Sequence, residues 1–369
     1  MTGLRSTLGK LFGGSKIEID GAPPAELVVA PDSADQIARL LDFASEHRLT
    51  VLPWGAGVHQ GFGGRIEPDV VVSSSNLAGA VEWNPDDLTV VVGSGVTLGG
   101  LDEVIGARRQ SAVLPEVDLS ATVGGVVAAG VSGWRRLRYG PTRDRLLQVQ
   151  FVTGDGRIVT GGARVVKNVT GYDIPRLLTG SFGSLGIITS VCLKLWPEPE
   201  VVATVTADDP ERAAAVTYRP QAVLETRDGV SVFLAGTSAE VEAQATALGG
   251  EVAEGFVWPE PPIGTCAVRM RVSPVDVSPL VAQIGTGPFI AAHGVGEILA
   301  GVVSDEIEPL REWAEVRGGT LVVERAPDDV YEAIDPWGAS PSTLDLQRKV
   351  KAAFDPLGVL VPGRLPGGI

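Results

Sequence analysis

Glycine is gathered in four clusters in the N-terminal half of this 369-residue chain, at residues 55–64, 93–100, 124–130 and 180–186. Glycine permits positive φ angles and puts no side chain between the backbone amides and an approaching group. A single cluster would more often be a set of tight turns, but four clusters in one region favour a dinucleotide-binding domain. Because few basic residues lie inside them, we expect amides and helix N-termini to hold the phosphates.

The first cluster does not have the spacing of a nicotinamide-dinucleotide site. Gly55, Gly57 and Gly61 form the pattern G-x-G-x-x-x-G, and no helix is predicted to begin on it. The Rossmann fingerprint is G-x-G-x-x-G and opens a helix directly. The sequence therefore predicts a glycine-lined cradle of a non-Rossmann type.

Charge argues against nucleic acid as a partner. The formal charge is -15 and the isoelectric point is about 4.7, so most of the surface should repel a phosphate backbone. Two cysteines, Cys192 and Cys266, are too few for a disulfide framework or a sulfur-ligated cluster, which favours reduced thiols in the cytoplasm. The three histidines have no metal-ligand spacing, so no metal site is predicted.

The chain is long enough for two domains, and the prolines within residues 196–200 mark the best boundary. We expect a flexible leader at 1–20, which lacks the apolar core of a secretory signal. Residues 21–199 form the first domain, residues 200–339 the second, and residues 340–369 a C-terminal helix and tail. No apolar run is long enough to cross a bilayer, so any peripheral association with an inner membrane would need a partner.

The second domain should contain an antiparallel sheet with helices on one side, which gives an α+β fold. Strand-like runs alternate there with helical segments, at residues 201–206, 230–234, 266–272, 297–302 and 320–324. In the first domain, hairpins are predicted at the Asn84-Pro85-Asp86-Asp87 turn and at Asp155-Gly156.

Ordered motifs link these glycine clusters. In chain order they are Pro53-Trp54-Gly55-Ala56-Gly57-Val58-His59, Pro115-Glu116, Thr122-Val123-Gly124-Gly125, Lys167-Asn168-Val169-Thr170-Gly171-Tyr172-Asp173, and Gly180 through Gly186-Ile187-Ile188. The set resembles the FAD-binding domain of the vanillyl-alcohol oxidase and p-cresol methylhydroxylase family, and within it the FAD-binding subunits of glycolate oxidase. The resemblance implies a two-part FAD-binding domain of p-cresol methylhydroxylase type, followed by a smaller antiparallel α+β substrate or cap domain.

The resemblance also implies which residues bind the cofactor. They are Pro53, Trp54, Gly55, Ala56, Gly57, Val58, His59, Pro115, Glu116, Thr122, Gly124, Gly125, Ala129, Gly186, Ile187 and Ile188. Some family members attach FAD covalently to a histidine of the first loop, and Gly57 falls at that position here. We therefore expect non-covalent FAD.

The C-terminal run from Phe354-Asp355-Pro356 to Pro362-Gly363-Arg364 is similar to the closing motif of the family. It departs from that motif at Val361, where the family has asparagine. The change removes an amide that donates and accepts hydrogen bonds, so a contact with the flavin or backbone at this position is in doubt.

The implied reaction is the oxidation of a 2-hydroxy acid to a 2-oxo acid. His293 is the candidate base, because imidazole titrates near neutral pH, although a structural histidine is an equally open interpretation. Arg364 is the candidate clamp for the substrate carboxylate, with Arg269, Arg271 and Arg136 as further candidates that would otherwise be ordinary surface arginines. Tyr172 could bind the substrate or be a buried tyrosine bonded to the backbone.

Two other functions remain open. The catalytic flavin subunits of glycolate oxidase are longer and carry a G-D-G-N-x-H run that this chain lacks. The chain could therefore bind FAD as a structural or electron-relay subunit, beside a longer flavoprotein and an iron-sulfur subunit. It could also be a stand-alone FAD oxidoreductase acting on another alcohol, since a fold does not determine a substrate.

Overall fold

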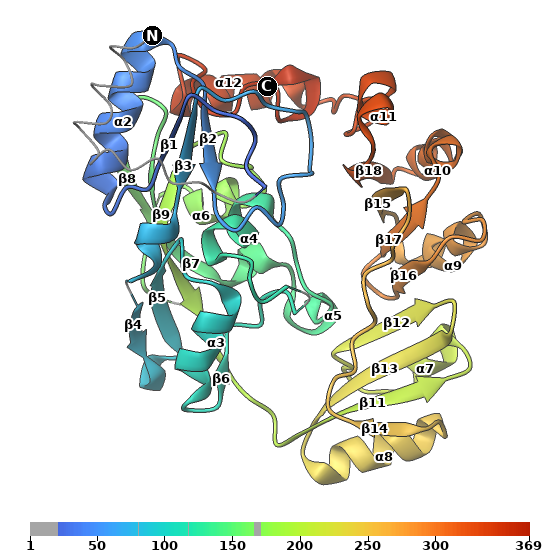
Figure 1. Ribbon diagram of the computed structural model, residues 1–369. Helices are drawn as coiled ribbons and strands as arrows, with labels where there is room; N and C mark the ends of the chain where they lie inside the picture. Colours follow the sequence, from blue (N-terminus) through green and yellow to red (C-terminus); the bar gives the residue numbers. More distant parts are fainter. Residues whose placement is uncertain (1–20, 80, 117, 166–170) are drawn as a thin grey trace.

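The computed structural model describes residues 21–79, 81–116, 118–165 and 171–369. The expected leader at 1–20 and the Lys167-Asn168 part of the fourth motif lie outside the described residues. Figure 1 shows an N-terminal lobe that carries two sheets and a C-terminal lobe that carries one larger sheet. Helix α12 (Leu344–Phe354) brings the end of the chain back to the N-terminal lobe.

The smaller N-terminal sheet is parallel, with β3 (Val70–Ser73) between β1 (Leu27–Val29) and β2 (Val51–Trp54). Helix α2 (Ala34–His47) begins at Ser33, whose hydroxyl accepts a hydrogen bond from the Gln36 amide. Its buried face is the one that the helical spacing predicts, and consists of Ile37, Leu40, Leu41 and Ala44. This face packs against β2 and β3 in one apolar cluster.

The second N-terminal sheet has five antiparallel strands. In sheet order they are β4 (Val81–Asn84), β5 (Thr89–Gly93), β9 (Ile187–Lys194), β7 (Leu146–Val152) and β8 (Ile158–Gly162). Both predicted hairpins are confirmed, because β4 pairs with β5 and β7 pairs with β8. Gly156 has a φ of 78° in the second turn, where glycine is favoured.

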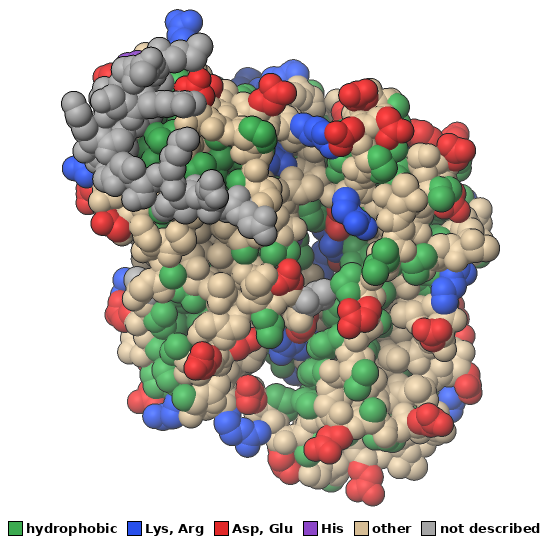
Figure 2. All heavy atoms as spheres, viewed as in Figure 1, with side chains coloured by type: hydrophobic (Ala, Val, Ile, Leu, Met, Phe, Trp, Pro, Cys, Tyr) green, Lys and Arg blue, Asp and Glu red, His purple; other side chains and the backbone are tan. Residues whose placement is uncertain are grey.

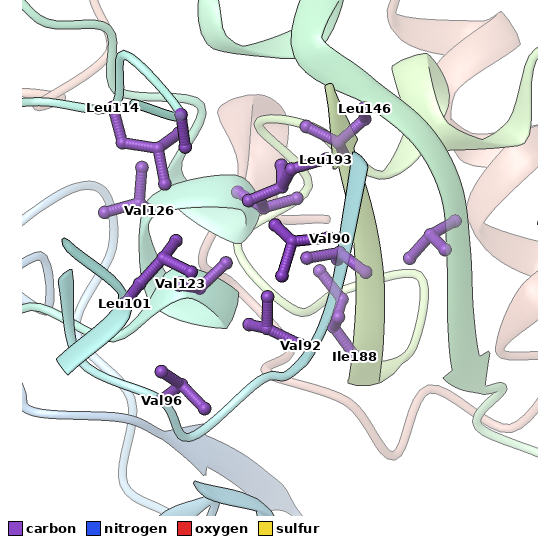
Figure 3. Close-up of a cluster of buried hydrophobic side chains, with 14 of the residues drawn as sticks. Val90, Val92, Val96, Leu101, Leu114, Val123, Val126, Leu146, Ile188 and Leu193 are labelled. Carbon is purple, nitrogen blue, oxygen red and sulfur yellow. The ribbon is translucent and has the colours of Figure 1, made fainter. Parts of the chain in front are cut away.

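Two helices cover this sheet, α3 (Leu98–Gly106) and α4 (Val123–Ala129). Each begins at a predicted threonine cap: the Thr97 hydroxyl accepts from the Gly100 amide and the Thr122 hydroxyl from the Gly125 amide. Figure 3 shows the shared core, in which side chains of α4 meet valines of β5 and Ile188 and Leu193 of β9. The remaining short elements of this lobe are β6 (Gln110–Ser111), α5 (Arg136–Tyr139), α6 (Ile174–Leu178) and β10 (Trp196–Pro197).

The C-terminal lobe is an eight-stranded antiparallel sheet of order β14-β11-β13-β12-β16-β17-β15-β18. Its strands are β11 (Val201–Ala207), β12 (Ala222–Thr226), β13 (Gly229–Gly236), β14 (Val252–Glu254), β15 (Cys266–Arg271), β16 (Phe289–Ala292), β17 (Glu297–Val302) and β18 (Thr320–Arg325). The predicted antiparallel sheet is confirmed. Strands β12, β14 and β16 were not predicted from the sequence; each has five residues or fewer and contains alanine, which is depleted in strands.

Four helices pack on one face of this sheet: α7 (Pro210–Val216), α8 (Ser238–Leu248), α9 (Val277–Val281) and α10 (Ser304–Glu315). Helix α11 (Asp328–Ala333) follows β18. Figure 1 shows α9 and α10 on the side of the sheet away from the N-terminal lobe. Since strand side chains alternate, the other face turns toward the N-terminal lobe, where Trp134 packs with Phe233 and Ile290.

The C-terminal segment is anchored by a buried ion pair. Asp355 accepts hydrogen bonds from the amides of Val359 and Leu360, and from the Lys351 ammonium at 2.6 Å. Lys351 also donates to the carbonyl oxygens of Ser184 and Leu360. The segment then runs beside β2, with Leu360 bridged to Val51.

Val361 has a φ of 39°, and its side chain is fully buried among Leu52, Trp54 and Val71. Asparagine tolerates this left-handed region better than a β-branched residue does. The position that differs from the family motif is therefore part of an apolar cluster, where the missing amide is replaced by apolar packing.

Cys192 and Cys266 are both buried and free. Within the described ranges, no helix is both long enough and apolar enough to cross a bilayer.

Candidate functional site

A groove of the N-terminal lobe lies where β2, β3, β5 and β9 meet α4, and it encloses about 810 Å³ that is partly open to solvent. Its walls come from all four glycine clusters and from the C-terminal tail. They include residues 53–60, 72–74, Ser94, Thr122, Gly124, Gly125, Ala128, Ala129, Phe182, Gly183, residues 186–188 and Arg364.

Close backbone approaches hold these clusters together. A Cβ added to Gly55 would collide with the Thr122 hydroxyl, which joins the first cluster to α4. A Cβ on Gly124 would lie 2.6 Å from the Cβ of Ser94. A side chain at either glycine would thus push apart the segments that form the groove. The separate glycine turns therefore converge in space.

The first loop offers a row of open backbone donors. Among the described residues, none accepts a hydrogen bond from the amides of residues 55–59, and all five line the groove. Gly57 bends this row with a φ of 79°. Successive amides of this kind form a cradle for phosphate oxygens.

We expected helix N-termini to help hold the phosphates, but the N-terminus of α4 has no free amides for this. Its first amides are already used inside the protein: Val123 donates to the Val96 carbonyl, Gly124 to the Ser94 carbonyl and Gly125 to the Thr122 hydroxyl. These bonds fix α4 as a wall of the groove. The open donors belong to the loop.

Ser94 supplies a further sign that a polar ligand belongs here. Its hydroxyl is buried and lacks a hydrogen-bond partner in the described part of the chain, although the residue lines the groove. A buried hydroxyl without a partner is costly. Together, the open amides and this hydroxyl fit a dinucleotide such as FAD.

Every residue expected to bind the cofactor lines the groove except Pro115 and Glu116. Glu116 lies in a neighbouring cleft, where it pairs with Arg135 and accepts from the Trp134 amide. The sequence analysis did not select several polar wall residues, among them Ser73, Ser74, Ser94 and Gln60. Ser94 follows Gly93 in the second glycine cluster, so the position of that cluster could have indicated Ser94 as a wall residue.

Arg364 reaches the groove, but its donors are engaged by the first loop. Its guanidinium donates to the carbonyl oxygens of Gln60 and Phe62 and to the Gln60 side chain. Burial lowers its pKa to about 10, so it stays charged at neutral pH. This arrangement makes Arg364 a clamp that joins the C-terminal tail to the FAD loop.

His59 lines the groove and is mostly neutral at physiological pH. Burial, aided by the nearby charge of Arg269, lowers the pKa of His59 to about 4, with Asp118 acting in the opposite direction.

The lowered pKa of His59 predicts a pH-dependent stability. In the unfolded chain a histidine titrates near pH 6.5, so unfolding takes up a proton between about pH 6.5 and 4. We expect the free energy of unfolding of the FAD-free chain to fall as the pH drops through this window. Urea unfolding at pH 7 and pH 5 should show a smaller loss of unfolding free energy for His59→Gln than for the unchanged protein. An equal loss in both proteins would contradict the assignment of this pH dependence to His59.

A buried charge cluster covers the inner face of the C-terminal sheet. Arg269 pairs with Glu297 at 2.6 Å and also with Glu324, and Glu297 accepts further bonds from Arg271 and Arg136. Burial alone would raise the pKa of Glu297, but the three guanidinium groups outweigh it and lower the pKa. Figure 2 shows a hollow between the lobes with Lys and Arg side chains inside it.

Neither of the other two residues proposed for catalysis lines the groove. His293 lies at a different pocket, where its Nε2 is 2.7 Å from a carboxylate oxygen of Glu225. Tyr172 is 90% exposed. The placement of His293 outside the groove argues against its role as the base at the flavin, and the Tyr172 side chain is not buried as the second interpretation required.

The comparisons with known proteins support FAD as the cofactor. Residues 25–162 match the family model described as FAD binding domain. Glycolate oxidase subunit GlcD of Bacillus subtilis is 34% identical over 187 residues, which cover 49% of this chain and 39% of that protein. Glycolate oxidase subunit GlcE of Escherichia coli is 27% identical over 303 residues, which cover 78% of this chain and 84% of that protein.

D-lactate dehydrogenase of Archaeoglobus fulgidus is 33% identical, over 47% of this chain. The match to it and the match to the Bacillus subtilis protein each span 39% of the relative's length. A solved structure of alkyldihydroxyacetonephosphate synthase superposes with a TM-score of 0.66 at 16% identity, over 93% of this chain and 78% of that one. It supports the p-cresol methylhydroxylase type of fold. Residues 25–162 therefore match the FAD binding domain family, and the chain is a flavoprotein that binds FAD.

Proposed function

We propose that the chain is the FAD-binding part of an oxidoreductase that oxidises a small 2-hydroxy acid to a 2-oxo acid. The observation that supports this most strongly is the row of open amides at residues 55–59 beside a sheet face rich in arginine. The relatives named as glycolate oxidase subunits and D-lactate dehydrogenase support the reaction class. We also propose that it works in a complex with a longer flavoprotein and an iron-sulfur subunit.

In this proposal the amides of residues 55–59 and the Ser94 hydroxyl hold the diphosphate. The walls around residues 122–129 and 186–188 pack against the remainder of the cofactor. When bound, FAD supplies the redox chemistry by accepting two electrons from the substrate. The protein supplies binding, orientation and charge.

The substrate carboxylate would bind the arginines of the inner sheet face. Arg271 and Arg136 share one oxygen of Glu297, at 3.0 and 3.3 Å, so both keep donors free. Arg269 is buried and pairs with both Glu297 and Glu324, so it would position the cluster. The Arg271 side chain is 48% exposed, more than those of Arg136 and Arg269. Its guanidinium group is therefore the most accessible of the three to an anion in the hollow.

Replacing Arg271 with methionine tests this assignment. The variant should keep its FAD and require about 10-fold to 100-fold more glycolate or lactate for half-maximal flavin bleaching, because a charge-assisted hydrogen bond contributes roughly 1.5–3 kcal/mol. The measurement is anaerobic titration followed by visible absorbance. Arg317→Met is the matched control, since Arg317 lies over Trp313 on the opposite face of the sheet; equal half-saturation in both variants would remove Arg271 from the substrate site.

A second function is favoured by the histidines. His59 is the histidine that lines the groove, and a group with a pKa of about 4 is a weak base at neutral pH. This supports the alternative in which the chain binds FAD as a structural or electron-relay subunit while a partner carries the catalytic base. The experiment is to purify the chain alone and add hydroxy acids without oxygen.

The outcomes separate the candidates clearly. Bleaching by glycolate or lactate alone supports an autonomous hydroxy-acid oxidoreductase. A yellow protein that stays oxidised alone but is active with its partner subunits supports the relay interpretation. Bleaching by another alcohol and by neither hydroxy acid supports a stand-alone enzyme of different specificity, and a colourless protein that refuses FAD would contradict all three.

A further inference from the structure

A second pocket lies where α5 of the N-terminal lobe meets β12 and the segment after α7, and it shares no wall residue with the FAD groove. Its walls include Arg138, Thr217, Arg219, His293 and the apolar Leu137 and Val223. We propose that this pocket binds a small carboxylate through the guanidinium groups of Arg138 and Arg219, with His293 beside the rest of the ligand. This inference is independent of the reaction proposed for the flavin site.

Positive charge is in excess at this pocket. In the part of the chain that the structure describes, neither Arg138 nor Arg219 forms an ion pair with a carboxylate. Arg138 lies over the ring of Tyr139, with its guanidinium carbon 5.5 Å from the ring centroid. Glu225 is the carboxylate that contacts the pocket histidine. The pocket thus has two guanidinium groups and one neighbouring carboxylate, and this excess of positive charge favours an anionic ligand.

His293 is oriented for a ligand by its neighbour. Its side chain is 10% exposed, and the Glu225 carboxylate holds the proton on Nε2 at a distance of 2.7 Å. Nδ1 has no hydrogen-bond partner among the described residues and is not among the fully buried unpaired atoms. It is therefore able to reach a ligand in the pocket that the ring lines.

The apolar walls decide between the common small anions. Leu137, Val223 and Pro220 suit a short carbon chain better than they suit the fully hydrated inorganic phosphate ion. A carboxylate on the arginines would leave its hydroxyl or methyl end near His293 and these walls. Acetate, glycolate and lactate are therefore the probes that the pocket should accept, and phosphate serves as the comparison.

The test uses the full FAD-loaded chain with isotope-labelled histidine, because the sequence contains three histidines and the His293→Gln variant identifies the signal of interest. Acetate, glycolate and lactate should shift the His293 imidazole resonances saturably, while inorganic phosphate shifts them weakly. Arg219→Gln should raise the half-saturating concentration about 10-fold, as expected for loss of one charge-assisted hydrogen bond. FAD content and flavin bleaching should remain those of the unchanged protein.

Arg317→Gln is the control, since its guanidinium packs on Trp313 in α10. The proposal would be overturned if Arg219→Gln and the Arg138→Gln, Arg219→Gln double variant both had the same half-saturating carboxylate concentration as the unchanged protein. A response to phosphate alone, or no response to any carboxylate, would also overturn it. Because acetate has no hydroxyl group to oxidise, its signals are read without turnover and stay separate from failure of the flavin reaction.

Discussion

Gly57→Val should produce a protein that folds but retains little or no FAD. Gly57 has a φ of 79°, where a β-branched residue costs roughly 1–3 kcal/mol. A Cβ there would also lie 2.7 Å from Cζ2 of the Trp54 ring. The loop must therefore move and turn its open amides away from the diphosphate, and we expect FAD affinity to fall at least about 100-fold, since each charge-assisted bond contributes roughly 1.5–3 kcal/mol.

The measurement is the ratio of flavin to protein absorbance after purification, followed by titration of the variant with FAD. Gly106→Val is the matched control, because Gly106 ends α3 in the same lobe and a Cβ there meets no atom within 4 Å. Circular dichroism checks that both variants fold. Full FAD occupancy in a folded Gly57→Val protein would show that the first loop does not hold the cofactor.

Asp355→Ala should be strongly destabilising. The Asp355 side chain is completely buried and accepts hydrogen bonds from two backbone amides and from Lys351. Removing it leaves the ammonium group of Lys351 buried without its counter-charge. We expect the free energy of unfolding to fall by about 3–5 kcal/mol. Urea unfolding measures this loss of stability. We also expect weaker FAD retention, because this segment carries Arg364 to the cofactor loop.

A double-mutant cycle separates the ion pair from simple loss of packing. Burial lowers the pKa of Lys351, and the Asp355 carboxylate opposes that change. Lys351→Met with Asp355→Ala should therefore cost less than the sum of the two single changes. Asp345→Ala is the control, since its side chain is 90% exposed. Additive single effects would show that the two buried side chains are not coupled.

The sequence was informative about local structure wherever a short-range rule applies. Thr97 and Thr122 cap their helices as predicted, and the Asp155-Gly156 turn closes its hairpin. The glycine clusters and ordered motifs also indicated the walls of the groove. These predictions succeeded because capping, turn conformation and side-chain alternation depend on a few consecutive residues.

The catalytic assignments depended on contacts between distant segments. Nothing local to Arg364 reveals that its donors are taken by Gln60 and Phe62, about three hundred residues away in the chain. Nothing local to His293 indicates that it pairs with Glu225 and lies outside the FAD groove. The sheet register brings Arg269 and Arg271 of β15 beside Glu297 of β17 and so decides the charge cluster.

By itself, the sequence determined that the N-terminal lobe would form a non-Rossmann, glycine-lined cradle, because glycine, which lacks a Cβ, allows close backbone approaches and adopts positive φ angles without strain. The tertiary structure alone decided which amides stay open: those of α4 are bonded to Val96, Ser94 and Thr122, and those of residues 55–59 are not. The physical reason is that a hydrogen bond between segments far apart in the chain depends on how they pack, and packing is a property of the whole fold.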